Sequence, residues 1–121
     1  MGKVVFVEDD PMIRKLVQTA LRASKHELHF AMNGREGLAL VERVHPDAVF
    51  TDVSMPEMDG IQLADAIRAH PDLKATPIVF ITASVQRDQV ARYFAHGATT
   101  YLAKPFSTAQ LREQVERLVK N

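Results

Sequence analysis

The chain has 121 residues, 46% of them hydrophobic and 25% charged, and its 15 basic and 15 acidic side chains give no formal net charge. A chain of this length fits one domain and hides roughly two thirds of its unfolded surface, so a hydrophobic core is expected. The balanced charge argues against a nucleic-acid or membrane partner, the absence of cysteine excludes disulfides and thiolate metal sites, and no apolar run approaches the ~20 residues of a membrane span.

Five short apolar runs alternate with five segments in which apolar residues recur at helical spacing. The predicted strands cover residues 4–7, 28–31, 48–51, 78–81 and 99–102. Continuously apolar strands separated by helices predict a parallel sheet with helices on both faces. We therefore expect one α/β domain over residues 1–121, with any ligand bound beyond the carboxyl ends of the strands.

Capping signals mark several of the predicted helix ends. Pro11 suits the first turn of the first helix, and Asp10 suits its N-cap. Gly97 is expected to end the fourth helix. Ser107 and Gln110 form the pattern of a capping box for the last helix.

Carboxylates, a hydroxyl and a lysine follow the carboxyl ends of four predicted strands. They are Glu8, Asp9 and Asp10 after the first strand, Asp52 after the third, Thr82 after the fourth and Lys104 after the fifth. Carboxylates that converge in one cleft need a cation, and oxygen ligands without His or Cys suit a hard ion, above all Mg²⁺. A lysine and a hydroxyl beside the ion would hold phosphate oxygens. The sequence therefore predicts a site for a phosphoryl group on or near a carboxylate.

Four segments of the chain resemble the receiver domain of two-component response regulators. They are VFVEDDP, PDAVFTDVSMPEMDG, PIVFITA and GATTYLAKPF, in the order and near the spacing that the family has. The resemblance covers essentially the whole chain. It implies a flavodoxin-like (βα)5 fold, doubly wound, in which a five-stranded parallel sheet has the strand order 2-1-3-4-5.

The resemblance also implies a function. A receiver domain takes a phosphoryl group from a histidine kinase or a phosphotransfer protein, with Mg²⁺ as its cofactor. It then changes the surface formed by its fourth helix, fifth strand and fifth helix, which a downstream protein or output domain reads. We therefore expect a cytoplasmic signalling phosphoacceptor, not an enzyme in the usual sense, that supplies part of its own phosphorylation and dephosphorylation chemistry.

Carried over residue by residue, the resemblance makes Asp52 the phosphoacceptor. Glu8 and Asp9 then form the metal pair together with Asp52, and Ser54 adds its backbone carbonyl. Asp10 falls one residue beyond the pair and keeps its role as helix cap. A competing register would use Asp9 and Asp10 for the metal.

On the phosphate side, the resemblance assigns the phosphoryl contact to the Thr82 hydroxyl and a close backbone approach to the small residue Ala83. Lys104 is expected to pair with Asp52 at rest and with phosphate afterwards. Tyr101, on the fifth strand, matches a switch residue that turns inward when Thr82 moves, although a packing aromatic is the alternative.

Ser54 and Ser84 occupy positions that tune the rate of hydrolysis in this family.

Three other functions are alternatives to this interpretation. An aspartyl-phosphate hydrolase of the haloacid-dehalogenase type would need Asp-x-Asp at the first strand end, whereas an FMN carrier would need a phosphate loop there. A degenerate receiver that only binds partners would lack part of the site.

Overall fold

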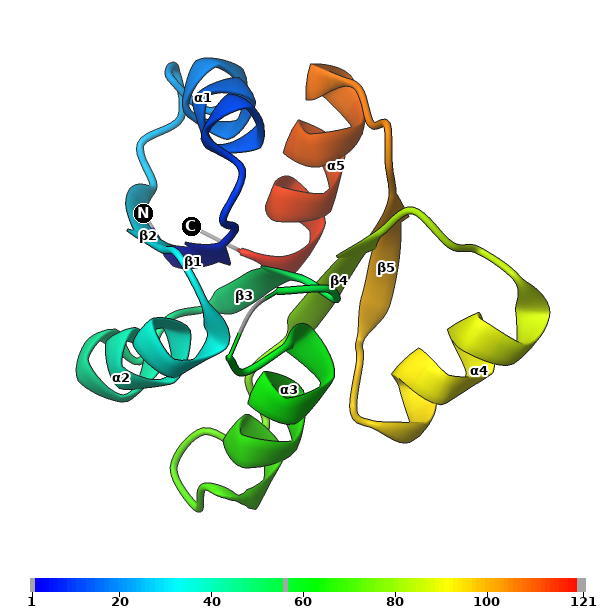
Figure 1. Cartoon of the computed structure of the whole chain (residues 1–121). Coiled ribbons are helices and arrows are strands. Elements are labelled where there is room, and N and C mark those ends of the chain that lie inside the picture. The colour runs from blue at the N-terminus through cyan, green and yellow to red at the C-terminus, as the bar shows by residue number, and fades with distance from the viewer. Residues whose placement is uncertain (1, 56, 120–121) are drawn as a thin grey trace.

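The computed structural model describes residues 2–55 and 57–119. Pro56 of the PEMDG segment and the outermost residues of the expected 1–121 domain, Met1, Lys120 and Asn121, lie outside the described part. Five strands alternate with five helices (Figure 1). The elements are β1 (Lys3–Val7), α1 (Pro11–Ala20), β2 (Glu27–Ala31), α2 (Gly34–Val44), β3 (Ala48–Asp52), α3 (Gly60–Ala69), β4 (Ile78–Thr82), α4 (Arg87–Ala95), β5 (Thr100–Ala103) and α5 (Thr108–Leu118).

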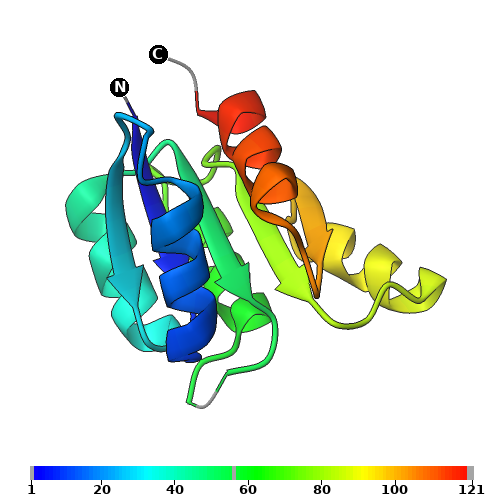
Figure 2. The ribbon, with the colours of Figure 1, turned by 90° about the horizontal axis from the view of Figure 1, so that it is seen from above.

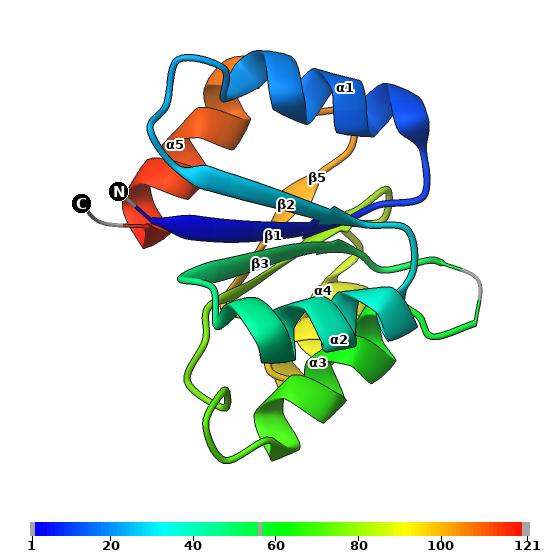
Figure 3. The same cartoon turned by 90° about the vertical axis from the view of Figure 1, so that its left-hand side faces the viewer.

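The five strands form one parallel sheet in the order β2-β1-β3-β4-β5. This confirms the expected flavodoxin-like arrangement, and each predicted strand lies within one residue of an observed one. Helices α1 and α5 cover one face of the sheet, and α2, α3 and α4 lie on the other (Figure 3). No helix in the described ranges is long and apolar enough to cross a membrane.

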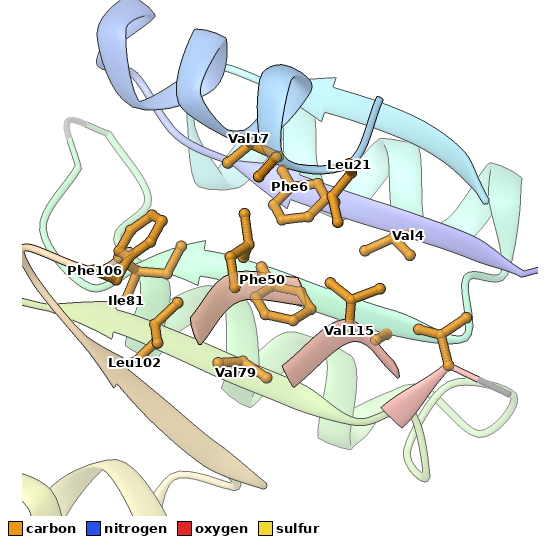
Figure 4. Close-up of a cluster of buried hydrophobic side chains, with 14 residues drawn as sticks. Val4, Phe6, Val17, Leu21, Phe50, Val79, Ile81, Leu102, Phe106 and Val115 are labelled. Atoms are coloured by element: carbon orange, nitrogen blue, oxygen red, sulfur yellow. The ribbon is translucent and has the colours of Figure 1, made fainter. Parts of the chain in front are cut away.

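The three central strands β1, β3 and β4 are buried on both faces, which explains their apolar runs, whereas the edge strands β2 and β5 are only partly buried. In β1, Val4 and Phe6 face α1 and α5, while Val5 and Val7 belong to the cluster beneath α2 and α3 (Figure 4 shows the first cluster). The ring of Phe6 stacks on that of Phe50 with centroids 5.0 Å apart. Each fully buried side chain of this size contributes roughly 1.5–3 kcal/mol, so these two apolar layers hold the sheet between its helices.

The helix ends follow the signals in the sequence. The Asp10 carboxylate accepts a hydrogen bond from the Met12 amide at 2.9 Å, and Pro11 is the first residue of α1. Ser107 and Gln110 form the expected capping box of α5. Gly97 follows the end of α4 with φ of 96°, a left-handed conformation that glycine adopts without steric cost.

Gly60 positions α3 directly against the end of β3. A Cβ atom at this position would collide with the carbonyl oxygen of Asp52. The Gly60 amide donates to the Val53 carbonyl at 2.9 Å, which closes the loop between the two elements. The absence of a side chain therefore lets the loop after β3 fold tightly beside Asp52.

All five strands point toward this edge of the sheet, where α1 also begins (Figure 2).

Arg68 on α3 joins two connections far apart in the sequence. Its guanidinium donates to the carbonyls of Lys74 at 2.8 Å and Thr76 at 2.6 Å, before β4, and to that of Gly97 at 2.6 Å, after α4. Burial lowers the pKa of the guanidinium, and the three carbonyls compensate its lost hydration. No pattern in the sequence indicates these contacts.

We expect Arg68→Met to lower the free energy of unfolding by about 2 kcal/mol, because it leaves three carbonyls without their charged donor. Urea denaturation measures the loss. Arg117→Met is the matched control, since Arg117 makes an exposed pair with Glu113 one helical turn away. Such pairs contribute about 0.3–0.5 kcal/mol. Equal losses in the two variants would contradict the assigned role of Arg68.

Candidate functional site

Three carboxylates meet at the carboxyl edge of the sheet. Glu8, Asp9 and Asp52 each offer an oxygen within 4.8 Å of the others. Glu8 and Asp9 follow β1, and Asp52 ends β3, which is paired directly with β1. Glu8 and Asp52 are buried, with exposed fractions of 2% and 7%, whereas Asp9 is exposed. The strand order therefore brings together residues that are 43 and 44 positions apart in the sequence.

Lys104 reaches this cluster from the turn that follows β5. Its Nζ lies 2.6 Å from Asp52 Oδ2 and 3.5 Å from Glu8 Oε1. The Lys104 amide donates to the Thr82 carbonyl at 2.8 Å, and the Lys104–Pro105 peptide bond is cis. Burial alone would lower the pKa of Lys104, but its hydrogen bond with Asp52 and the charges of Asp52 and Glu8 outweigh burial and raise it. Lys104 is therefore a firmly protonated partner of the carboxylates.

Glu8 experiences the opposite imbalance. Burial first, and then the negative charge of Asp52, raise the pKa of Glu8 from its ordinary 4.5 to about 7, although the Asp10 amide and Lys104 act in the other direction. Within the described residues, no group donates a hydrogen bond to the buried Glu8 Oε1. The Lys104 Nζ is an ion-pair partner of this oxygen at 3.5 Å, too far for a good hydrogen bond. Three carboxylates beside one lysine leave excess negative charge. A hard divalent cation such as Mg²⁺ fits this all-oxygen site.

Asp10 and Ser54 lie on either side of the cluster with different roles. The Asp10 side chain caps α1, and it is not part of the group of converging carboxylates. The Ser54 amide donates to Asp52 Oδ1 at 3.2 Å, so the backbone of the exposed Ser54 runs next to the Asp52 carboxylate. The geometry thus favours Glu8 and Asp9 over Asp9 and Asp10 as the pair beside Asp52.

The hydroxyl of Thr82, at the end of β4, lies in a small hydrogen-bonded group. It accepts from the Ser84 amide at 3.0 Å, and its oxygen lies 2.7 Å from the hydroxyl oxygen of Tyr93 on α4. The Tyr93 hydroxyl is also 3.2 Å from the Ser84 carbonyl. Ala83 is exposed, and Ser84 is half-buried. The loop after β4 is therefore attached to α4 through the side chain of Thr82.

The hydroxyl that contacts Thr82 belongs to Tyr93 on α4, whereas the expected switch residue Tyr101 lies on β5. Tyr101 is half-buried on β5, with its ring edge-to-face against Phe94 at 6.4 Å, and no described residue forms a hydrogen bond with its hydroxyl. Helical spacing in the sequence places Tyr93 on the inward face of α4 but says nothing of the partner of its hydroxyl. A tyrosine on the buried face of a helix needs a hydrogen-bond partner for its hydroxyl. This requirement is the signal from which a polar contact of Tyr93 could have been predicted.

The family model of the response regulator receiver domain matches residues 4–116, and the chain belongs to this family. Receiver domains are the signalling phosphoacceptors of two-component systems. Regulatory protein AtoC of Escherichia coli (strain K12) is 33% identical over 120 residues, which are 99% of this chain and 26% of AtoC. Transcriptional regulatory protein SrrA of Staphylococcus aureus is 34% identical over 98% of this chain and 48% of SrrA. The chain thus spans less than half the length of these two relatives.

Solved structures agree with this assignment. Chemotaxis response regulator CheY4 of Vibrio cholerae superposes with a TM-score of 0.92 at 34% identity, covering 98% of both chains. The receiver domain of sensor histidine kinase PA1611 from Pseudomonas aeruginosa has a TM-score of 0.88 at 27% identity, covering 97% of this chain and 96% of that one. That structure holds a magnesium ion coordinated in its active-site cleft.

The raised pKa of Glu8 predicts an unusual pH dependence of stability. In metal-free protein, folded Glu8 keeps its proton up to about pH 7, whereas unfolded Glu8 loses it near 4.5. The folded state therefore binds more protons in this window, and the free energy of unfolding should fall as the pH rises from about 5 to about 7. Urea midpoints in the presence of a chelator measure this component.

Glu8→Gln is the control, because its amide does not titrate and the component should disappear. The same pH dependence in both proteins would contradict the assignment to Glu8. Added Mg²⁺ should stabilise the unaltered chain more at about pH 8 than at about pH 6, because the ion and the proton compete for the same carboxylate.

Proposed function

We propose that this chain accepts a phosphoryl group on Asp52 from the phosphohistidine of a histidine kinase or phosphotransfer protein in the cytoplasm, and relays the signal to a downstream protein or output domain. Residues 1–121 would form the single receiver domain. The observation that carries the proposal is the buried Asp52 carboxylate, held between two further carboxylates and the Nζ of Lys104. No packing requirement accounts for that arrangement at a sheet edge.

The metal ligands of the proposal are the carboxylates of Glu8, Asp9 and Asp52 together with the backbone carbonyl of Ser54. When bound, Mg²⁺ supplies positive charge that offsets the negative charge of the transferring phosphoryl group. The Glu8 oxygen that accepts no hydrogen bond and the all-oxygen donor set support this assignment. So does the magnesium ion in the PA1611 receiver domain.

In the transfer, an oxygen of the ionised Asp52 carboxylate attacks phosphorus, and the bond from phosphorus to the imidazole nitrogen breaks with its electron pair remaining on the imidazole. The product on this chain is an acyl phosphate. Lys104 holds Asp52 in place beforehand and can then move its hydrogen bond to a phosphoryl oxygen. The raised pKa of Lys104 keeps this donor protonated before transfer, and the negative phosphoryl group would favour the same charged form afterwards.

The phosphoryl group adds about −1.5 to −2 charge and three acceptor oxygens. The Thr82 hydroxyl would donate to one of these oxygens, and the backbone at Ala83 would approach the group. The resulting movement of the loop after β4 would bias the surface of α4, β5 and α5, with Tyr101 as a further switch residue. Ser54 and Ser84 flank the site, where their side chains would influence how fast water removes the phosphoryl group.

We expect Asp52→Asn to abolish acid-labile, Mg²⁺-dependent labelling by phosphohistidine or by a small phosphodonor, because the amide cannot attack phosphorus. Radiolabel retained on the protein measures it. Asp10→Asn is the matched control and should label normally, since Asp10 caps α1. Full labelling of Asp52→Asn would refute the phosphoacceptor, and continuous turnover of phosphate esters would favour a hydrolase instead.

A separate comparison tests the metal ligands. Glu8→Gln and Asp9→Asn should each weaken Mg²⁺ binding by at least about tenfold, because each removes a charge from the converging carboxylates. Asp10→Asn should change it by less than about twofold. Titration of Mg²⁺ by calorimetry gives the three dissociation constants. Greater damage from Asp10→Asn than from Glu8→Gln would mean that the competing register is correct.

A further inference from the structure

Tyr93 is the one fully buried contact between α4 and the sheet, beside the partly buried Val90 and the exposed Phe94. Of the nine residues of α4, all of which the structure describes, only Tyr93 is buried, with 2% of its surface exposed. Its ring packs edge-to-face on Phe80 of β4, with centroids 5.5 Å apart. The polar end of this anchor lies against Thr82, two residues further along β4. The attachment of α4 therefore ends at the residue that the proposed function assigns to the phosphoryl group.

The hydrogen bonds around Thr82 leave no free proton on its hydroxyl. The Ser84 amide donates to the Thr82 hydroxyl oxygen. The hydroxyl protons of Thr82 and Tyr93 can each go to the other hydroxyl or to the Ser84 carbonyl. If Thr82 donates to Tyr93, then Tyr93 donates to the carbonyl. If Tyr93 donates to Thr82, then Thr82 donates to the carbonyl. In both arrangements the Thr82 proton already has an acceptor inside the protein.

This closed group competes with phosphorylation. A phosphoryl oxygen needs the same Thr82 proton, so Thr82 must give up its bond either to Tyr93 or to the Ser84 carbonyl. A rotation of the Thr82 side chain toward a phosphoryl group on Asp52 gives up both. The Tyr93 hydroxyl is buried with the rest of its side chain, so it would keep only the Ser84 carbonyl as a partner. A buried polar group that loses a partner destabilises the state in which the loss occurs. When Thr82 donates to a phosphoryl oxygen, Tyr93 therefore has one hydrogen-bond partner fewer and is bound less firmly to the sheet.

We propose, on the basis of the proposed phosphorylation of Asp52, that the Tyr93 hydroxyl is a latch. It holds the Thr82 side chain in its resting orientation and releases it when the phosphoryl group arrives. Tyr93 is thus a positioning residue that acts on the site through Thr82 and carries the state of the site to α4. The partner surface on α4 changes because Tyr93, the one buried side chain of α4, loses its hydrogen bond to Thr82 at that moment.

The test uses Tyr93→Phe, which keeps the ring against Phe80 and removes only the hydroxyl. The probe is beryllofluoride with Mg²⁺, a stable analogue of the phosphoryl group, titrated against the full chain. Because the variant lacks the competing hydrogen bond, its apparent dissociation constant should be about two- to tenfold lower than that of the unaltered chain. Urea denaturation should show that the same variant is slightly less stable, and a merely structural defect does not produce tighter binding.

Thr82→Ala provides the control, because the latch acts only through Thr82. Adding Tyr93→Phe to Thr82→Ala should leave beryllofluoride binding unchanged. Binding that is unchanged or weaker in Tyr93→Phe alone, or a gain that persists in the Thr82→Ala background, would overturn the latch but leave the phosphoacceptor intact. An unaltered chain that neither binds beryllofluoride nor becomes labelled would remove the proposed function, and the latch with it.

A second measurement does not depend on changing Tyr93. The chain has two tyrosines and no tryptophan, so Tyr101→Phe makes Tyr93 the only strong intrinsic fluorophore. The latch requires the Tyr93 hydroxyl to exchange its hydrogen-bond partner when beryllofluoride and Mg²⁺ bind. Its emission intensity should therefore change on titration, with the same midpoint as binding. An emission that stays constant through saturation would overturn the latch.

Discussion

The contact on which the site depends is the one between Asp52, Glu8 and Lys104. Pairing of β1 with β3 delivers two carboxylates to one place, and burial removes most of the water that would otherwise separate their charges. The single positive charge of Lys104 cannot neutralise the three carboxylates of Glu8, Asp9 and Asp52. The raised pKa of Glu8 reflects burial and this lack of positive charge. The fold thus maintains a local destabilisation at its carboxyl edge, and a bound cation or a redistribution of charge relieves it. Such a site responds to ligands because it is unsatisfied without them.

The groups that would hold a phosphoryl group are all occupied in the resting structure. Lys104 is bound to Asp52, and Thr82 is bound to Tyr93 and Ser84. A ligand at Asp52 must therefore break existing hydrogen bonds as it forms its own. Lys104 and Thr82 therefore have two alternative sets of hydrogen bonds, one within the protein and one to a ligand at Asp52. Two such alternatives are the condition for a switch between populations of two states. Lys104 and Thr82 are also joined through their backbones, so the two sets share one rigid base at β4 and β5.

The sequence predicted the fold well, because its signals are local. The three central strands are buried on both faces and therefore largely apolar, and the alternation with helical segments marks the two half-buried edge strands, so each of the five was located to within one residue. The strand order and the assignment of Lys104 came from the resemblance, since periodicity does not say which strands are neighbours. The contacts of Arg68 and Tyr93 could not be predicted in this way. Helical spacing shows that Tyr93 faces inward, but the partner of its hydroxyl depends on how α4 lies on β4.

The helices differ in what attaches them to the sheet, and this difference decides which of them can respond to the site. Val17 and Ala20 of α1, and Leu111 and Val115 of α5, are buried apolar residues that no change in hydrogen bonding affects. Helix α4 has no comparable set of buried apolar residues: Val90 is partly buried, Phe94 is exposed, and its one buried side chain, Tyr93, ends in a hydroxyl. Apolar burial depends on area and varies little with small movements, whereas a hydrogen bond is lost over a fraction of an ångström. A change in the hydrogen bonds of Thr82 therefore affects the position of α4 more directly than that of any helix held through apolar contacts alone.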